Sequence, residues 1–280
     1  MTRRDFFPIA GLAIAGAGWA KPKMIDSTIN GVTIGAQTYS FRDRPLDGCI
    51  AAMKEIGLGE AELYNGHIEP KDKQALAAFR NDPPLEQMRE VRRKFDDAGI
   101  RLYALNYSFR QDWSDQELES GFAIARAIGV KYITASSNVS TAKRLAPMAE
   151  KHRIIVAFHN HSNMAPDEFA RPSDFEQAIA LSKFIGINLD IGHFVAAGFD
   201  PVSFLDQHHD RIVTLHIKDR KKNQGPAVPF GEGDTPIKAV LQILKNKRYP
   251  IPANIEYEYK GGDTITEVRK CFDYCKAALS

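Results

Sequence analysis

The stretch that decides the fold runs from residue 154 to residue 161 and reads Ile154-Ile155-Val156-Ala157-Phe158-His159-Asn160-His161. Residues two apart in a β-strand share a face. Ile154, Val156 and Phe158 put bulky apolar side chains on one face, whereas His159 and His161 lie on the other. We predict a strand whose apolar face packs against helices and whose histidines point inward near its C-terminal end.

Comparable strands recur along the chain and alternate with amphipathic helical segments, a pattern typical of a parallel sheet. No linker rich in proline, glycine or serine divides the chain, and no G-x-G-x-x-G motif follows the first strand. We therefore predict an α/β fold, a single-domain (β/α)8 TIM barrel over residues 30–280. Its strands are expected at Val32–Gln37, Ala61–Tyr64, Ile100–Asn106, Tyr132–Ser136, Ile154–His159, Ile185–Asp190, Ile212–Ile217 and Ala253–Glu258.

The composition is that of an ordinary globular protein and limits the partners to be expected. The 280 residues carry a formal net charge of +2, with 26% charged and 44% hydrophobic residues. Proteins that bind nucleic acid normally have a basic excess, so we expect no nucleic-acid partner. The oligomeric state stays open, and an oligomer is possible.

The first 22 residues resemble an export signal. Arg3 and Arg4 precede an apolar stretch rich in alanine and glycine, which ends in the small-x-small pattern Gly18-Trp19-Ala20. This stretch is shorter than a membrane span requires, and the arginine pair resembles the twin-arginine signal. We expect a periplasmic or otherwise exported protein with no stable membrane association after the signal is removed.

Three cysteines, Cys49, Cys271 and Cys275, are too few for a disulfide framework. In a closed barrel the first and last helices are neighbours, so Cys49 could pair with one of the other two. The simpler interpretation is that all three are small buried side chains.

Four strand ends place metal-binding residue types on the inward face. These residues are His159, Asp190, His216 and Glu256. Two imidazoles and two carboxylates are a plausible ligand set for one divalent metal ion, namely Mn²⁺, Zn²⁺, Co²⁺ or Fe²⁺. A site for Mg²⁺ would be richer in oxygen ligands, so this ion is less expected. The alternative is a set of unrelated buried polar residues, each paired with a neighbour.

The same residues carry a resemblance to the sugar phosphate isomerase/epimerase branch of the xylose isomerase-like barrel superfamily. The resemblance implies a divalent metal at the ends of strands five to eight and proton transfer next to a metal-polarised carbonyl. It extends over most of the chain and rests on Gln37–Arg42, Glu62, His159–His161, Asp190–His193, His216–Asp219, Gly231–Asp234 and Glu256.

One position departs from the family pattern. Many members have a glutamate where this chain has His159, and that glutamate pairs with the one matching Glu256 to supply two bases on opposite faces of the substrate. Here Glu256 alone remains. We therefore expect single-base chemistry, either aldose–ketose isomerisation or elimination next to a ketone.

Roles follow from the chemistry of the side chains. Glu256, or Glu258 beside it, is expected to act as general base, while Lys218 and His193 stabilise an enolate or orient hydroxyl groups. Lys218 could instead form an ion pair with Glu256 or Asp190. A further set of residues is expected to contact a carbohydrate substrate, namely His161, Glu62, His67, Asn106 and Trp113. Trp113 could stack on a sugar face or simply pack over the end of the barrel.

Three other functions deserve comparison. DNA-repair endonucleases of the same superfamily need additional metal ligands before the glycine loop, and residues 225–230 lack them. A lyase or deglycosidase acting by elimination on 3-keto-glycosides is the main alternative to an isomerase, and a non-catalytic periplasmic sugar-binding barrel is the other. An exported enzyme without a phosphate-binding glycine loop is expected to act on a non-phosphorylated sugar or keto-sugar.

Overall fold

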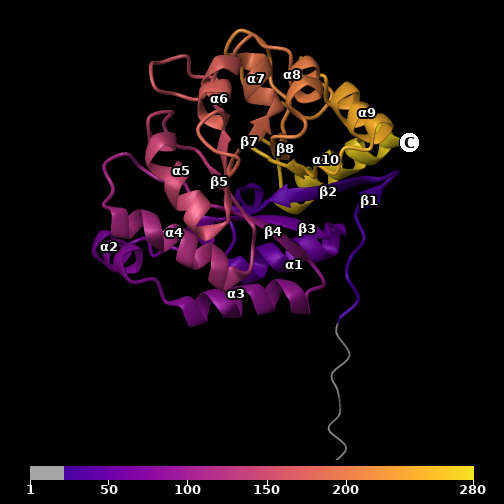
Figure 1. Ribbon diagram of the computed structural model, residues 1–280. Helices are drawn as coiled ribbons and strands as arrows, with labels where there is room; N and C mark the ends of the chain where they lie inside the picture. The colour runs from indigo at the N-terminus through magenta and orange to yellow at the C-terminus, as the bar shows by residue number, and fades with distance from the viewer. Residues whose placement is uncertain (1–21) are drawn as a thin grey trace, which may run out of the picture.

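The computed structural model describes residues 22–280, in which eight parallel strands form a closed barrel (Figure 1). The barrel closes where β2 pairs with β9, with Ile34 opposite Ala253 and Ala36 opposite Ile255. A short strand, β1 (Thr28–Ile29), pairs antiparallel with the start of β2. The barrel strands are β2 (Val32–Gln37), β3 (Glu60–Tyr64), β4 (Arg101–Asn106), β5 (Tyr132–Ala135), β6 (Ile155–His159), β7 (Ile185–Asp190), β8 (Ile212–Ile217) and β9 (Ala253–Ile255). The predicted (β/α)8 TIM barrel is confirmed. The arginine pair of the predicted export signal lies outside the described residues.

Helices surround the strands on the outside of the barrel (Figure 1). Within residues 22–280, no helix combines the length and apolar character needed to cross a membrane. The helices are α1 (Leu46–Ile56), α2 (Lys73–Asn81), α3 (Leu85–Asp97), α4 (Asp115–Ile128), α5 (Thr141–His152), α6 (Pro172–Ile179), α7 (Ile191–Ala196), α8 (Pro201–His208), α9 (Ile237–Lys247) and α10 (Thr264–Leu279). Two short 3-10 helices, η1 (Thr38–Phe41) and η2 (Asn65–His67), follow β2 and β3.

Helix α4 shows how local sequence sets the helix ends. The Ser114 side chain accepts a hydrogen bond from the Glu117 amide at 3.2 Å, and the Glu117 carboxylate accepts one from the Ser114 amide at 2.8 Å. This reciprocal capping satisfies two amides that have no partner inside the helix. The helix ends before Gly129, whose φ of 80° is a left-handed conformation that glycine adopts without strain.

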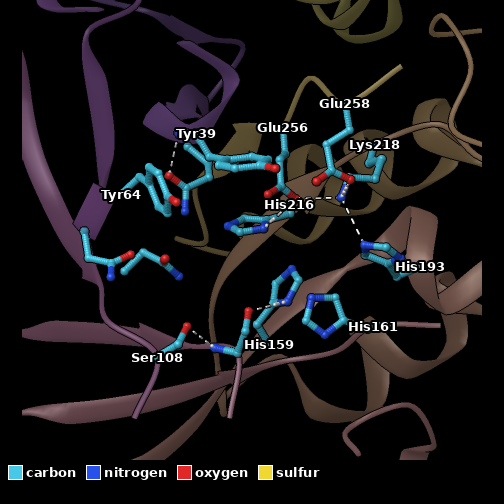
Figure 2. A pocket seen from close by; sticks show the side chains of 14 residues that line it. Tyr39, Tyr64, Ser108, His159, His161, His193, His216, Lys218, Glu256 and Glu258 are labelled. Atoms are coloured by element: carbon cyan, nitrogen blue, oxygen red, sulfur yellow. Dashed lines mark hydrogen bonds and ion pairs between the residues drawn. The ribbon is translucent and has the colours of Figure 1, made fainter. Parts of the chain in front are cut away.

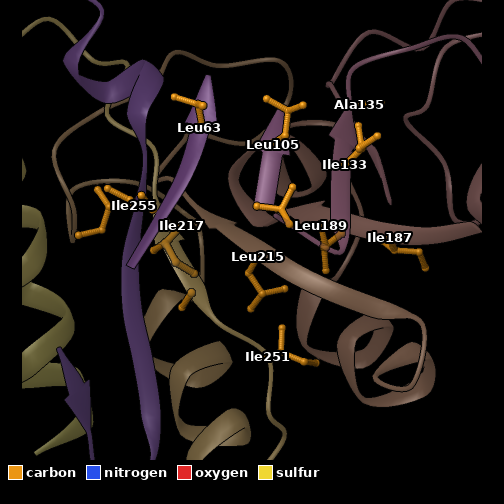
Figure 3. Packing of buried hydrophobic residues seen from close by; sticks show 14 of the residues in the cluster. Leu63, Leu105, Ile133, Ala135, Ile187, Leu189, Leu215, Ile217, Ile251 and Ile255 are labelled. Atoms are coloured by element: carbon orange, nitrogen blue, oxygen red, sulfur yellow. The ribbon is translucent and has the colours of Figure 1, made fainter. Parts of the chain in front are cut away.

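The main hydrophobic core lies between the strands and the helices. Figure 3 shows side chains such as Leu63, Leu105 and Ile217 projecting from the strands into this layer, and all three are fully buried. Each such side chain stabilises the fold by ~1.5–3 kcal/mol. The outward apolar face that the sequence predicts for the strands therefore supplies the packing that holds the barrel together.

Strand β9 is shorter than predicted and ends at Ile255 rather than Glu258. It ends there because the neighbouring strand β2 ends at Gln37, where the 3-10 helix η1 begins, and offers no further backbone partner. The Ser40 side chain takes over and accepts a hydrogen bond from the Tyr257 amide at 2.9 Å. Glu256 still donates its amide to Ile217 at 3.0 Å, so it keeps a strand-like position.

All three cysteines are free and buried, one in α1 and two in α10. Burial raises the pKa of the Cys49 and Cys271 thiols to about 12. The structure therefore agrees with small buried side chains rather than with a disulfide.

The N-terminal end of the barrel buries one carboxyl group. Glu60, the first residue of β3, is 1% exposed, and its Oε1 atom has no hydrogen-bond partner. Its Oε2 atom lies 3.4 Å from a guanidinium nitrogen of Arg101. Burial raises the pKa of Glu60 from its ordinary value of 4.5 to about 7, even though Arg101 opposes this shift.

This raised pKa predicts a pH-dependent loss of stability. Because the unfolded chain ionises Glu60 at lower pH than the folded protein does, stability falls as pH rises from 4.5 through about 7. Glu60→Gln should raise the free energy of unfolding at pH 8 by about 1–3 kcal/mol more than at pH 5, measured by urea denaturation. The same change at the exposed Glu232 should show no such difference, and equal effects of Glu60→Gln at both pH values would contradict the prediction.

Candidate active site

Four of the predicted residues meet at the C-terminal end of the barrel. His159 ends β6, Asp190 ends β7, His216 lies one residue before the end of β8, and Glu256 follows β9. Each is buried, and one nitrogen or oxygen atom from each lies within 4.8 Å of those of the others. Figure 2 shows His159, His216 and Glu256 among the residues that line the pocket. The structure thus brings together the predicted metal-ligand set.

A carboxylate beneath the cluster fixes the His216 ring. Glu62 Oε2 lies 2.9 Å from His216 Nε2, while Glu256 Oε2 lies 3.1 Å from Nδ1. Glu62 also accepts hydrogen bonds from Gln37 at 2.9 Å and from Thr134 at 2.6 Å. A carboxylate that accepts the far N–H of a histidine is the usual way to orient a metal-binding imidazole. Glu62 is fully buried, does not line the cavity above the cluster and contacts His216, and its contact with substrate stays a prediction.

Lys218 lies at the centre of the negative charge. Its ammonium group is 3.1 Å from Asp190, 2.8 Å from Glu256 and 2.7 Å from Glu258, and its side chain is 2% exposed. Burial alone would lower the pKa of Lys218, but the three carboxylates outweigh burial and raise it well above its ordinary value. Burial alone would raise the pKa of Glu256, yet Lys218 and His216 hold it well below the usual range. Both ion pairs considered for Lys218 are present.

His193 lies between two cationic side chains. Its Nε2 atom is 3.1 Å from the Lys218 ammonium, and its Nδ1 atom is 2.6 Å from the Arg220 guanidinium. Burial and Lys218 together hold the pKa of His193 well below its ordinary value, so the ring is neutral. Arg220 is held in turn by Ser162 Oγ at 2.9 Å and by the Gly225 carbonyl. The His193 ring is therefore fixed at the edge of the cluster.

A cavity of about 430 Å³ opens above the cluster, a size suited to a small-molecule ligand. The predicted residues His161 and Asn106 line it. So do the groups described above, namely His159, His193, His216, Lys218, Glu256 and Glu258. Sequence reasoning missed most of the opposite wall, which consists of Tyr39, Tyr64, Asn65, Ser108 and Ser136. Only Tyr39 belongs to a motif quoted for the family resemblance, because the others lie at strand ends or in loops without a distinctive pattern.

Two predicted substrate contacts lie away from this cavity. Trp113 is 8% exposed and packs against Tyr107 and Phe109, with its ring centroid 5.7 and 6.5 Å from theirs. It therefore packs over the end of the barrel, the second of the two placements considered, and its stacking on a sugar stays a prediction. His67 places Nε2 3.1 Å from the Thr38 carbonyl and lines a neighbouring cavity instead.

Comparison with known proteins now adds to this geometry. Residues 50–277 match the family model described as the xylose isomerase-like TIM barrel. The chain belongs to the xylose isomerase-like TIM barrel family. Over 92 residues it is 34% identical to the L-ribulose-5-phosphate 3-epimerase UlaE of Escherichia coli, and the aligned part covers 32% of each chain. The chain thus spans about a third of the length of the curated relatives it matches.

Two solved structures share the fold of this family member at low sequence identity. The D-allulose 3-epimerase from Methylomonas sp. has a TM-score of 0.66 and 14% identity, over 93% of this chain and 100% of that chain. The IOLI protein, described with a binding zinc atom, has a TM-score of 0.64 and 17% identity, over 89% and 96% of the two chains. At these identities the likeness shows the barrel fold alone.

The residues present fit a divalent cation. His159 Nε2 and Asp190 Oδ2 lie 3.6 Å apart, and neither makes a hydrogen bond of good geometry although both are buried. Buried polar atoms rarely lack a hydrogen bond, so His159 Nε2 is available to an ion, and Asp190 Oδ2 could bind one beside its ion pair with Lys218. The cluster also has an excess of negative charge, because Asp190, Glu256 and Glu258 surround Lys218 while Glu62 contacts His216.

The glycine loop of this family member shapes the rim of the site. The Asp219 carboxylate, next to Lys218, accepts hydrogen bonds from the amides of Gly231 at 2.8 Å, Gly233 at 3.0 Å and Thr235 at 3.2 Å. A side chain at residue 233 would place its Cβ atom 1.8 Å from Asp219 Oδ1, so only glycine fits there. The segments His216–Asp219 and Gly231–Asp234 therefore act together to fold the loop between β8 and α9.

The contact between Glu62 and His216 predicts a specific effect on metal binding. Glu62→Gln replaces a charged acceptor by an amide that holds the imidazole less firmly, so the dissociation constant for Zn²⁺ or Mn²⁺ should rise about 10–100-fold. Isothermal titration calorimetry would measure this change. The matched control is Glu60→Gln, the same substitution at the first residue of β3, which should leave the metal affinity unchanged. Equal affinities in the wild type and Glu62→Gln would show that Glu62 does not orient a ligand.

Proposed function

We propose that this protein is a divalent-metal-dependent enzyme that transfers a proton next to the carbonyl of a non-phosphorylated sugar or keto-sugar. The observation that carries the proposal is the buried cluster of His159, Asp190, His216 and Glu256 with Lys218 directly beside it. Membership of the xylose isomerase-like family and the partial match to an epimerase support it. The zinc described for a protein of the same fold supports metal dependence.

The charges of the cavity favour a substrate without phosphate. Among residues 22–280, Lys218 is the only lysine or arginine that lines the cavity, and three carboxylates already surround its ammonium group. A phosphate group there would meet the negative charges of Glu256 and Glu258. Neutral hydroxyl groups, in contrast, match the amide and hydroxyl side chains of Asn106 and Ser136 on the other wall.

The placement of the carboxylates supports single-base chemistry. Within the described part of the chain, Glu256 and Glu258 are the carboxylates that line the cavity, and both follow β9. They approach a substrate from one side, whereas epimerisation by two bases needs groups on opposite faces. The wall opposite carries Ser108 and Ser136, with ordinary hydroxyl groups.

The residues then have defined tasks. A divalent ion, when bound, supplies Lewis-acid polarisation of the substrate oxygens. Glu256 takes the proton from the carbon next to the carbonyl, and the electron pair of that C–H bond forms a C=C bond as the carbonyl oxygen becomes an enolate. The positive charge of Lys218, which lies 3.1 Å from His193, stabilises the enolate oxygen. For isomerisation, the hydroxyl proton on the deprotonated carbon passes to the enolate oxygen, and Glu256 returns its proton to the former carbonyl carbon. For elimination from a 3-keto-glycoside, the enolate re-forms the carbonyl, the C–O bond on the next carbon breaks, and the leaving alcohol takes the proton held by Glu256.

The role of Glu256 predicts a sharp loss of activity. Glu256→Gln removes the base but keeps an oxygen donor, so kcat should fall about 10²–10⁴-fold while the metal content stays largely unchanged. Mass spectrometry of aldoses, ketoses and 3-keto-glycosides would measure turnover, and metal analysis would measure binding. The matched control is Glu258→Gln, which should cost much less.

Near-normal turnover by Glu256→Gln would refute the assignment. A wild-type protein that binds sugars but never exchanges their C–H protons in heavy water would instead be a sugar-binding barrel.

We also propose that the protein is exported by the twin-arginine route. Replacing Arg3 and Arg4 by lysine keeps the charge but removes the arginine pair, so the protein should accumulate in the cytoplasm. Fractionation of cells that express the full chain would show this, with Lys23→Arg as the control. Unchanged export of the double variant would contradict the proposal.

A further inference from the structure

A second cavity of about 450 Å³ lies beside the first. The two share one residue, Tyr64, which lines both. The second cavity is formed by the segment that follows β2, including Arg42 and Arg44, and by the segment that follows β3, including His67 and Lys71. It is as large as the cavity above the metal-ligand cluster, so there is room for a second ring-sized group next to the reacting one.

The Tyr64 ring is fixed between the two cavities. It meets the Tyr39 ring edge-on with centroids 5.0 Å apart, and the His67 ring lies 5.9 Å away on the other side. Figure 2 shows Tyr39 and Tyr64 next to each other on one wall of the first cavity. Gly66 makes room for this position, because a Cβ atom there would lie 2.3 Å from Tyr64 Cε1. An aromatic ring held in this way can pack against a sugar.

Polar partners hold three of the charged side chains that line the second cavity, namely Arg42, Arg44 and Glu69. The Arg42 guanidinium donates to the carbonyls of Tyr39 at 3.2 Å and Tyr257 at 2.9 Å. Arg44 lies 3.3 Å from Asp263. The carboxylate of Glu69 accepts a hydrogen bond from Arg80 at 3.1 Å. A charged ligand would have to displace these partners, whereas hydroxyl groups can both donate to and accept from them.

We propose that the second cavity binds a second sugar ring, so that the protein acts on a disaccharide or a related glycoside. The reacting ring lies above the metal-ligand cluster, and its neighbour lies against Tyr64 among His67, Lys71 and Leu46. This inference rests on the proposed function, because it extends the same site. It assigns a substrate of two linked rings rather than a single free sugar.

A third cavity, of about 430 Å³, adjoins the first at Ser136 and provides a comparison. Its aromatic residue, Phe109, is 1% exposed and offers no ring to a ligand. Its wall instead consists of polar side chains such as Gln111 and Asn138. The second cavity is therefore the better place for a sugar ring, and the third supplies a matched control.

The experiment measures binding rather than turnover, so that the inference and the proposed function are tested separately. Calorimetry of the full chain, loaded with Mn²⁺, compares three pairs of probes: D-fructose with lactulose, D-glucose with maltose, and D-glucose with cellobiose. We expect the disaccharide of at least one pair to bind about tenfold more tightly than its monosaccharide, because its second ring adds contacts with Tyr64. Lys71→Trp fills the second cavity and should remove most of that preference.

Gln111→Trp, which fills the third cavity, should leave the preference intact. If Lys71→Trp does not fold, Leu46→Trp fills the second cavity from the start of α1 and replaces it. Equal affinities within all three pairs, or a preference that survives filling of the second cavity, would overturn the inference. Proton exchange from a sugar in heavy water tests the proposed function independently. If exchange occurs but no disaccharide is preferred, the second sugar site is contradicted while the proposed function stands.

Discussion

The ammonium group of Lys218 has carboxylate oxygens from Asp190, Glu256 and Glu258 within 3.1 Å and almost no access to water. Transferring such charges from water into a protein costs several kcal/mol for each ion, and the cost is recovered only when the partners are all in place. The C-terminal end of the barrel therefore folds as one electrostatic unit. The orientation of His193, the negative charge of the site and its capacity to bind a cation all depend on these ion pairs.

Hydrogen-bond register between the strands brings these groups to the same place. Asp190 lies directly opposite His216 in the pairing of β7 with β8, and His159 lies opposite Asn188 in the pairing of β6 with β7. Side chains on strands are held more rigidly than those on loops, so the metal-ligand set has little freedom. Tyr39 and Tyr64, on the substrate-facing wall, lie at or just after strand ends. Substitutions there can change the shape of the cavity without disturbing the metal-ligand cluster.

Much of the fold and the metal-ligand cluster could be predicted, because both depend on a two-residue repeat that is visible in the sequence. The same repeat correctly places Glu62 on an inward face, but it cannot tell how far along the barrel that residue lies. In the structure Glu62 does not line the cavity above the cluster and contacts His216. Trp113 and His67 follow strands, where the path of the chain rather than a repeat decides where a side chain lies. The shorter β9 depends on where its neighbour β2 ends, which is a tertiary property.

The three buried thiols have a consequence for where this protein can work. A thiol must ionise before it attacks a disulfide or an oxidant, and burial keeps Cys49 and Cys271 protonated at neutral pH. The fold thus uses no disulfide and buries all three thiols, so its cysteines do not make its stability depend on the redox potential around it. A barrel of this kind can complete folding in a reducing compartment and keep the same covalent structure in an oxidising one.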